Sequence, residues 1–264
     1  MRNVIGNLMR AALSLLSVII ILTCCNNDKQ PADLLVDYDT TIPDTAKPII
    51  TTSFKGTTFP SIFEAAFEIG TKVSEGDWTY KLYNYDIGKI KIESGKIIAC
   101  DPIVMHDAIP FTQTFPIGEF PVNLSIAING KDERVAFSRI AFSNESVSKW
   151  EFALPRGQKP ISLYDSTVYC YGVDAGMGVF IDSVSSYYFN LKDQSDWENV
   201  FIRKAEKKGN RGFINDFDGH NFAIFSTGYG DGCYATFVGF DAKGQICQIL
   251  TDFGLVGWWK LKGS

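Results

Sequence analysis

Apolar and polar residues alternate most clearly between positions 120 and 129 of the chain. A period of two places successive side chains on opposite faces of a strand, so this segment is predicted to be a half-buried β-strand. Asn129-Gly130 follows it and is a strong turn signal. Residues 134–142 are therefore predicted to return as its antiparallel neighbour. The apolar positions of the first strand are Phe120, Val122, Leu124, Ile126 and Ile128.

Shorter apolar segments predict further strands. Two of them, 90–92 and 97–99, flank Glu93-Ser94-Gly95 and are expected to form a hairpin. Asp241-Ala242-Lys243-Gly244 is expected to make the turn between the last two strands. The other predicted strands are 149–154, 167–173, 177–183, 221–226, 234–240 and 245–253.

Two segments carry helix-start signals. Ser61-Ile62-Phe63-Glu64 and Ser195-Asp196-Trp197-Glu198 are capping-box patterns, in which the Ser and Glu side chains satisfy free amides of the first turn. Apolar residues follow each at helical spacing, and Gly70 and Gly209 are suited to end the two helices. The predicted fold class is α+β, a mostly antiparallel β-sheet with two helices at about residues 61–70 and 195–208.

The N-terminus has the plan of a bacterial secretory signal. Arg2 and Arg10 give it a positive start, and residues 11–22 form an apolar run shorter than the roughly 20 residues of a membrane span. The sequence Leu22-Thr23-Cys24-Cys25 resembles the lipobox cleaved by lipoprotein signal peptidase. We place the lipid-modified cysteine at Cys25. The alternative, Cys24, would put the bulky Leu22 where the lipobox has a small residue.

The chain is therefore expected to have three parts. Residues 1–24 are the predicted signal peptide, residues 25–57 a lipid-anchored polar tether rich in proline, and residues 58–264 a single globular domain. Two or more acyl chains on the cysteine would anchor the protein stably to a membrane. The expected location is the periplasm or the cell surface.

Charge and composition narrow the classes of partner. Removing the signal takes away Arg2 and Arg10 and no acid, so 23 basic residues remain against 30 acidic ones, a net charge of −7. Binding to a phosphate backbone needs a concentrated basic face, so nucleic acid is not an expected partner. Apolar residues make up 45% of the chain, which is enough to build a substantial core.

Four cysteines fall in the predicted domain, and their spacing matches neither a disulfide scaffold nor a zinc site. An exported protein could oxidise them, so their disulfide state stays open. The turn at 241–244 would place Cys247 opposite Val238 and away from Cys233, which argues against a Cys233–Cys247 bridge. Buried thiols are expected for most of the four. The four are Cys100, Cys170, Cys233 and Cys247.

Several stretches, occurring in order over roughly residues 78–255, resemble the family known as the domain of unknown function 4241. The most distinctive are Tyr171-Gly172-Val173-Asp174-Ala175-Gly176 and Gly228-Tyr229-Gly230-Asp231-Gly232-Cys233-Tyr234. Other matching segments include Gly95–Pro102, Pro121–Ala127 and Thr251-Asp252-Phe253. The resemblance implies a fold family and no particular reaction.

The candidate catalytic residues are acidic: Asp174, Asp182 and Asp231. Carboxylates at strand ends could hold Ca²⁺ or Mg²⁺, with Asp174 and Asp231 as the candidate metal ligands, or could divide acid and base roles. The alternative is that Asp beside Gly marks a turn. The two histidines, His106 and His220, lie in Asp-containing loops without the spacing of a known catalytic motif. No cofactor is evident, although a divalent cation remains an option.

Two functions follow from these residues. The first is a non-catalytic lipoprotein whose domain binds a protein or glycan partner at the cell envelope. The second is a hydrolase or metal-dependent enzyme that uses the Asp cluster. The aromatic residues that favour the first are Trp150, Tyr229, Tyr234, Trp258 and Trp259.

Overall fold

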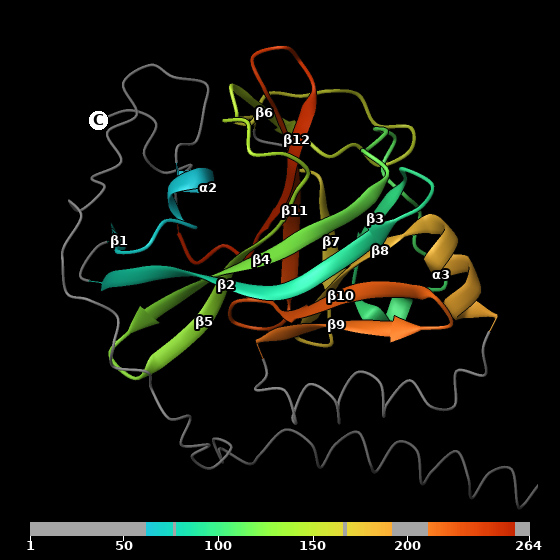
Figure 1. Ribbon diagram of the computed structural model, residues 1–264. Coiled ribbons are helices and arrows are strands. Elements are labelled where there is room, and N and C mark those ends of the chain that lie inside the picture. Colours follow the sequence, from blue (N-terminus) through green and yellow to red (C-terminus); the bar gives the residue numbers. More distant parts are fainter. Residues whose placement is uncertain (1–61, 76–77, 166–167, 192–210, 257–264) are drawn as a thin grey trace, which may run out of the picture. The chain divides into compact units, whose positions relative to one another are not determined.

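A computed structural model describes residues 62–75, 78–165, 168–191 and 211–256 (Figure 1). The predicted signal peptide, the predicted tether at 25–57 and the predicted helix at 195–208 lie outside these residues. What is described folds into two antiparallel sheets with short helices, which confirms the predicted α+β class.

The larger sheet has eight strands in the order β1-β2-β4-β5-β12-β11-β6, with β7 also paired to β11. β6 pairs with the C-terminal half of β11 and β7 with its N-terminal half, so the two short strands share one edge. The strands are β1 (Thr71–Glu75), β2 (Trp78–Ile92), β4 (Gly118–Asn129), β5 (Asp132–Ala141), β6 (Lys149–Phe152), β7 (Cys170–Val173), β11 (Gly232–Phe240) and β12 (Ile246–Asp252).

The smaller sheet has four strands in the order β3-β8-β10-β9. Three short helices accompany the sheets: α2 (Ile62–Ala65), the 3₁₀-helix η1 (Pro102–Val104) and α3 (Ser183–Asn190). The strands are β3 (Ile97–Cys100), β8 (Met177–Asp182), β9 (Gly212–Phe217) and β10 (His220–Ser226).

The two sheets share one apolar core. Alternate residues of the smaller sheet, such as Ala99, Phe180 and Phe225, join the core formed by the larger sheet. Their neighbours form a second cluster on the opposite face, against which Phe189 of α3 packs. The sheets approach closely at Gly212, where a Cβ would lie 2.9 Å from a methyl group of Leu124 in β4 and 2.7 Å from the Ile224 carbonyl oxygen.

The α2 segment covers the other face of the larger sheet. The Phe63 ring contacts Phe137, Trp150 and Phe237 at centroid distances of 5.8, 5.2 and 4.8 Å. The Ser125 hydroxyl of β4 donates to the Ala66 carbonyl at 2.7 Å. Residues 122–127 are therefore buried on both faces, whereas the alternation predicted a half-buried strand.

Most predicted strands are present, and the predicted pairing of β4 with β5 is confirmed. The β11–β12 pairing is also confirmed, but the predicted register is wrong: a bulge after Gly239 places Ile249, and not Cys247, opposite Val238. The hairpin predicted around Glu93-Ser94-Gly95 is wrong too, because β3 pairs with β8 in the other sheet.

Helix α2 is shorter than the predicted helix at 61–70 and gives way to turns at Ala66. Helix α3 was not predicted. Its tyrosines and phenylalanine favour a strand, but the Asp182 carboxylate accepts the Val184 backbone N–H at 2.9 Å and starts the helix.

Candidate functional site

Asp174 and Asp231 lie at the same end of neighbouring strands. Asp174 follows β7 and Asp231 precedes β11, and the last register pair of the two strands is Val173 with Gly232. The next position on each strand is therefore an aspartate, and both are exposed. The two loops also touch, since a Cβ on Gly176 would lie 3.7 Å from the Gly230 Cα.

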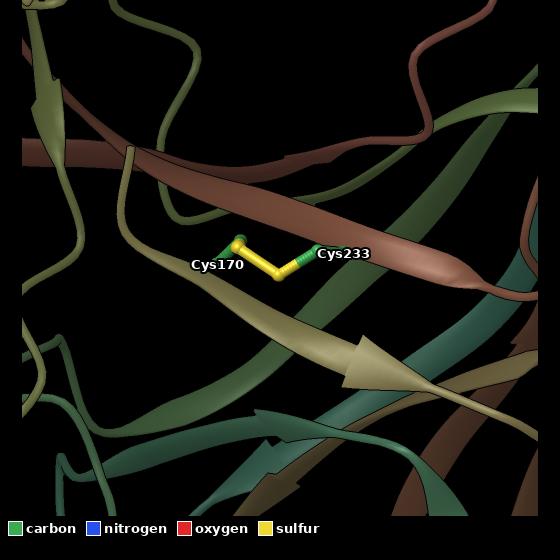
Figure 2. The surroundings of a disulfide bond; sticks show 2 residues. All are labelled: Cys170 and Cys233. Carbon is green, nitrogen blue, oxygen red and sulfur yellow. A yellow bond between two sulfur atoms is a disulfide. The ribbon is translucent and has the colours of Figure 1, made fainter. Parts of the chain in front are cut away.

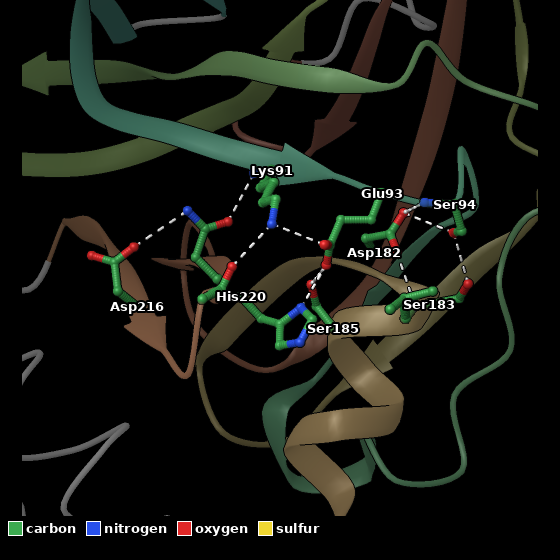
Figure 3. Close-up of polar contacts among 11 residues, drawn as sticks. Lys91, Glu93, Ser94, Asp182, Ser183, Ser185, Asp216 and His220 are labelled. Carbon is green, nitrogen blue, oxygen red and sulfur yellow. Dashed lines mark hydrogen bonds and ion pairs between the residues drawn. The ribbon is translucent and has the colours of Figure 1, made fainter.

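Asp182 lies at the far end of β8 and is fully buried. Besides capping α3, its carboxylate accepts the Ser94 backbone N–H at 3.0 Å and the Ser94 hydroxyl at 2.8 Å (Figure 3). The six residues of β8 separate it from the loop of Asp174, a distance of roughly 20 Å for an extended chain. The structure thus brings two of the three candidate carboxylates together and holds the third apart.

Asp101 also acts on the Asp174 loop. Its buried carboxylate accepts the backbone N–H groups of Asp174 and Ala175 at 2.7 and 2.8 Å, and the Ile103 N–H at 2.7 Å. These bonds join the end of β3 to the end of β7. The buried Asp101 carboxylate therefore fixes the backbone conformation of the loop that carries Asp174.

Cys170 and Cys233 form a disulfide between β7 and β11 (Figure 2). Their Cα atoms lie 5.4 Å apart, and both residues are exposed. The sequence left this bridge open, because 63 residues separate the two cysteines and no local pattern pairs them. The other two domain cysteines, Cys100 and Cys247, are buried free thiols, so the expectation of buried thiols for most of the four holds for only two.

Burial makes both free thiols poor nucleophiles. It raises the pKa of Cys100 to about 12, with a further contribution from the charge of Asp101. It raises the pKa of Cys247 to about 11, to which Asp241 adds. A thiol reacts as its thiolate, so neither residue is poised for nucleophilic chemistry near neutral pH.

An apolar cavity of about 290 Å³ lies beside the disulfide. Strands β3, β7 and β11 and the loop after η1 supply its walls, and three tyrosines are among its lining residues. Two exposed apolar residues line it, Val104 and Ile109 at 47 and 63%, and two more, Ile103 and Val168 at 46 and 52%, adjoin lining residues in the sequence. We call these four residues the apolar rim. Contiguous exposed apolar patches of several hundred Å² are typical of interaction sites, whereas scattered exposed apolar residues are normal.

A polar network lies elsewhere, where β2, β10 and α3 meet (Figure 3). The Glu93 carboxylate lies 2.5 Å from His220 Nδ1 and 2.9 Å from Lys91 Nζ. The His220 ring stacks on Tyr188 with centroids 4.6 Å apart. Lys91 Nζ also donates to the Gly219 carbonyl at 3.1 Å. Sequence reasoning left His220 without a partner, because Glu93 is 127 positions away.

The network controls the ionisation of Glu93. Partial burial acts to raise the pKa of this carboxyl, but hydrogen bonds from Lys91 and His220 and their charges outweigh it and lower the pKa. The ionised form of Glu93 is therefore the one that the fold stabilises. An open, mostly polar cavity of about 290 Å³ adjoins Lys91 and His220.

The aromatic candidates separate into buried and exposed residues. Trp150 and Tyr234 belong to the core, and Tyr234 also lines the cavity beside the disulfide. Tyr229 is exposed, with the Arg134 guanidinium 4.5 Å above its ring. Trp258 and Trp259 lie outside the described residues.

The described residues contain neither a metal-ligand cluster nor a helix suited to span a membrane. No three histidine, cysteine or acidic side chains there gather closely enough to hold a metal ion. None of the helices in that part of the chain has the length and apolar character needed to cross a membrane.

Comparison with known proteins identifies one family. Neither the curated proteins nor the solved structures gave a match. A family model described as a protein of unknown function, DUF4241, matches residues 90–251. This range runs from the end of β2 to β12 and includes both aspartate loops, the disulfide and the cavity walls. Since the match covers more than half of the chain, the protein belongs to the DUF4241 family.

Proposed function

We propose that this protein is an exported, lipid-anchored lipoprotein whose globular domain binds a partner at the cell envelope without catalysis. The exposed disulfide between Cys170 and Cys233 supports export, because disulfides persist in oxidising compartments and are rare in the cytosol. The lipobox-like Leu22-Thr23-Cys24-Cys25 supports anchoring at Cys25.

The apolar rim is the observation that carries the binding role. Two exposed aliphatic side chains in the cavity wall, and two that adjoin wall residues in the sequence, cost solubility and contribute little to the core. A partner that covers them removes apolar surface from water. This arrangement favours a protein partner over a glycan, because protein interfaces have an apolar centre surrounded by polar groups.

Anchoring is tested by mass spectrometry of the protein produced in a bacterium from its full gene. The expected product begins at a diacylglyceryl-modified Cys25 and partitions with membranes. Cys25→Ser should yield unlipidated precursor, whereas Cys24→Ser should still be processed. If Cys25→Ser is processed normally and Cys24→Ser is not, the anchor is at Cys24. Failure of both variants to alter partitioning removes the lipoprotein proposal.

Binding is tested in the same cells with a photo-crosslinking amino acid placed at Ile109 or at Ile117. The two residues are matched, since both are isoleucines and are 63 and 68% exposed, but only Ile109 lines the cavity. A crosslinked product specific to position 109 is expected. Identical crosslinking patterns at both positions would contradict a partner at the rim.

The register of β7 and β11 supports a second candidate function, that of a hydrolase or metal-dependent enzyme. It sets Asp174 beside Asp231, and paired carboxylates suit Ca²⁺ or Mg²⁺. A bound ion should raise the melting temperature of the wild type but not of Asp174→Asn or Asp231→Asn. If neither ion changes the melting temperature, the binding proposal stands without this alternative.

A further inference from the structure

We propose that the outer face of the larger sheet, the face that α2 covers, contains a binding site for a small hydroxycarboxylate. Arg139 of β5 binds the carboxylate, and Gln248 of β12 accepts a hydrogen bond from the hydroxyl. The cavity beside the disulfide lies on the opposite face of this sheet, so the inference goes beyond the proposed function and does not depend on it. Its support comes from unpaired buried polar atoms, the contacts of Arg139 and the strand register.

Arg139 is a largely buried cation whose Nε has no hydrogen-bond partner within the described part of the chain. Its guanidinium carbon lies 3.8 Å from the centre of the Phe67 ring, which follows α2 and fixes the position of the charge. Burial lowers the pKa of Arg139 to about 10, although the charge of Glu64 acts against this, so the guanidinium is cationic at neutral pH. The Glu64 carboxylate itself accepts the Val147 backbone N–H at 3.1 Å. A buried donor left unpaired costs free energy, which an acceptor on a ligand would remove.

Gln248 provides an unpaired acceptor on the same face. Leu250 of β12 lies opposite Arg139, and Gln248 lies opposite Ala141, two positions further along β5. Such diagonal neighbours on one face are roughly 7–8 Å apart, within reach of long side chains. Gln248 is only 6% exposed, and its Oε1 also has no hydrogen-bond partner among the described residues. A buried donor and a buried acceptor are thus neighbours on the sheet, and neither is bonded to the other.

The neighbouring positions favour a ligand over another side chain of the sheet. Ala141, directly opposite Gln248, offers no polar group to it. Asn123 of β4 lies directly opposite Arg139 and is 7% exposed, so a second buried amide adjoins the guanidinium. An amide carries no charge and leaves the cation of Arg139 without an anion. The site therefore has hydrogen-bonding groups of both kinds and lacks a negative charge.

The unpaired donor and acceptor together define the chemistry of the ligand. A guanidinium matches the two oxygens of a carboxylate in charge and geometry. A carboxylate alone has no proton to give to the Gln248 Oε1, whereas a hydroxyl on the next carbon donates to it. An ammonium group in place of the hydroxyl would bring a second cation close to Arg139, which disfavours an amino acid. The ligand is therefore a carboxylate with a neighbouring hydroxyl.

The test titrates the full-length chain, purified in a non-ionic detergent, while NMR follows the arginine Nε–H resonances. Glycolate should shift the Arg139 Nε–H resonance saturably, in the millimolar range expected for so small a ligand. Acetate should bind about tenfold more weakly, because it makes no bond to Gln248. Neutral glycolamide should give no saturable shift. Arg134 of the same strand is the internal control: its Nε already donates to Asp132 at 2.8 Å and should not respond.

Two substitutions test the two residues separately. Gln248→Met keeps the length of the side chain and removes the acceptor, so it should weaken glycolate binding about tenfold and leave acetate binding unchanged. Arg139→Met should abolish the response of the Gln248 side-chain amide to glycolate, and the matched Arg134→Met should preserve it. If Arg139→Met does not fold, the effect of Gln248→Met on the two probes decides. Equal affinity of the wild type for acetate and glycolate, or no saturable shift of Arg139 with either, overturns the site.

Discussion

The carboxylate of Asp101 accepts the backbone N–H of Asp174 at 2.7 Å, across a separation of 73 residues. One buried side chain at the end of β3 thus holds the backbone of the loop that follows β7. The candidate residue Asp174 is exposed, whereas the residue that organises its backbone is hidden.

Asp101→Asn should destabilise the fold by about 2–4 kcal/mol. The carboxylate accepts three backbone N–H groups, and an amide has only one acceptor oxygen, so at least one buried donor would lose a charge-assisted bond. Urea unfolding measures the loss. Asp174→Asn is the matched control and should change stability by less than about 0.5 kcal/mol. Equal effects of the two substitutions would show that Asp101 has no special role.

Reduction of the disulfide should lower stability by about 4 kcal/mol in the chain-entropy account, since the bridge closes a loop of 63 residues. Cys170→Ser with Cys233→Ser should reproduce the effect without reductant. A variant with Ala at the buried thiols Cys100 and Cys247 should remain sensitive to reductant. A melting temperature that dithiothreitol leaves unchanged would contradict a bridge in solution.

Glu93 should make stability depend on acid pH. Its pKa is lower in the folded state than its ordinary 4.5, so the ionised carboxylate stabilises the fold above that value. This contribution is lost as the pH falls through the depressed pKa. Glu93→Gln should cost up to about 1 kcal/mol at pH 7, and its difference from wild type should vanish in acid. Glu145→Gln, at an exposed position away from this network, controls for the loss of one charge.

Tyr171→Phe should be neutral or stabilising by up to about 1 kcal/mol. The Tyr171 hydroxyl is buried near Thr251 but has no partner in hydrogen-bonding geometry within the described part of the chain. Removing an unsatisfied buried group removes a desolvation cost. Tyr234→Phe should instead cost about 1 kcal/mol, because it loses the bond to Gly230. Thermal unfolding of both variants measures this difference in stability. A Tyr171→Phe variant less stable than the wild type would contradict the prediction.

Gly212→Ala should destabilise by about 1–3 kcal/mol. The added Cβ would lie 2.7 Å from the Ile224 carbonyl oxygen, a backbone atom that cannot move aside as a side chain can. Denaturant unfolding gives the cost. Gly172→Ala on β7 serves as control, since no heavy atom outside its chain neighbours lies within 4 Å of its Cβ position. A tolerated Gly212→Ala would show that the sheets are less closely packed.

Local patterns predicted the strands well because alternation and turn residues act over a few positions. The pairing of β4 with β5 follows from Asn129-Gly130. The wrong hairpin at Glu93-Ser94-Gly95 shows that turn residues alone do not determine which strands pair. The turn residues are there, but Asp182 binds both the N–H and the hydroxyl of Ser94, and β3 joins β8 instead. A partner 88 residues away decides the outcome.

The grouping of the candidate site residues depends on long-range contacts even more strongly than the strand pairing does. Asp174, Asp182 and Asp231 could be recognised as strand-end acids, yet their grouping followed from the β7–β11 register and the length of β8. The partnership of Glu93 with His220 joins different sheets, so no spacing along the chain reveals it. The burial of Trp150 beneath α2 likewise removed an aromatic candidate that composition alone retained.

The chain between β6 and β7 leaves the large sheet after Phe152 and returns to the same edge of β11 at Cys170. Ala153, Pro155 and Tyr169, at the two ends of this excursion, form part of the cavity wall. Lengthening or shortening the excursion would reshape the pocket while β11 keeps its pairing with β12. The shape of this cavity is thus set by a connection whose length the sheet itself does not constrain.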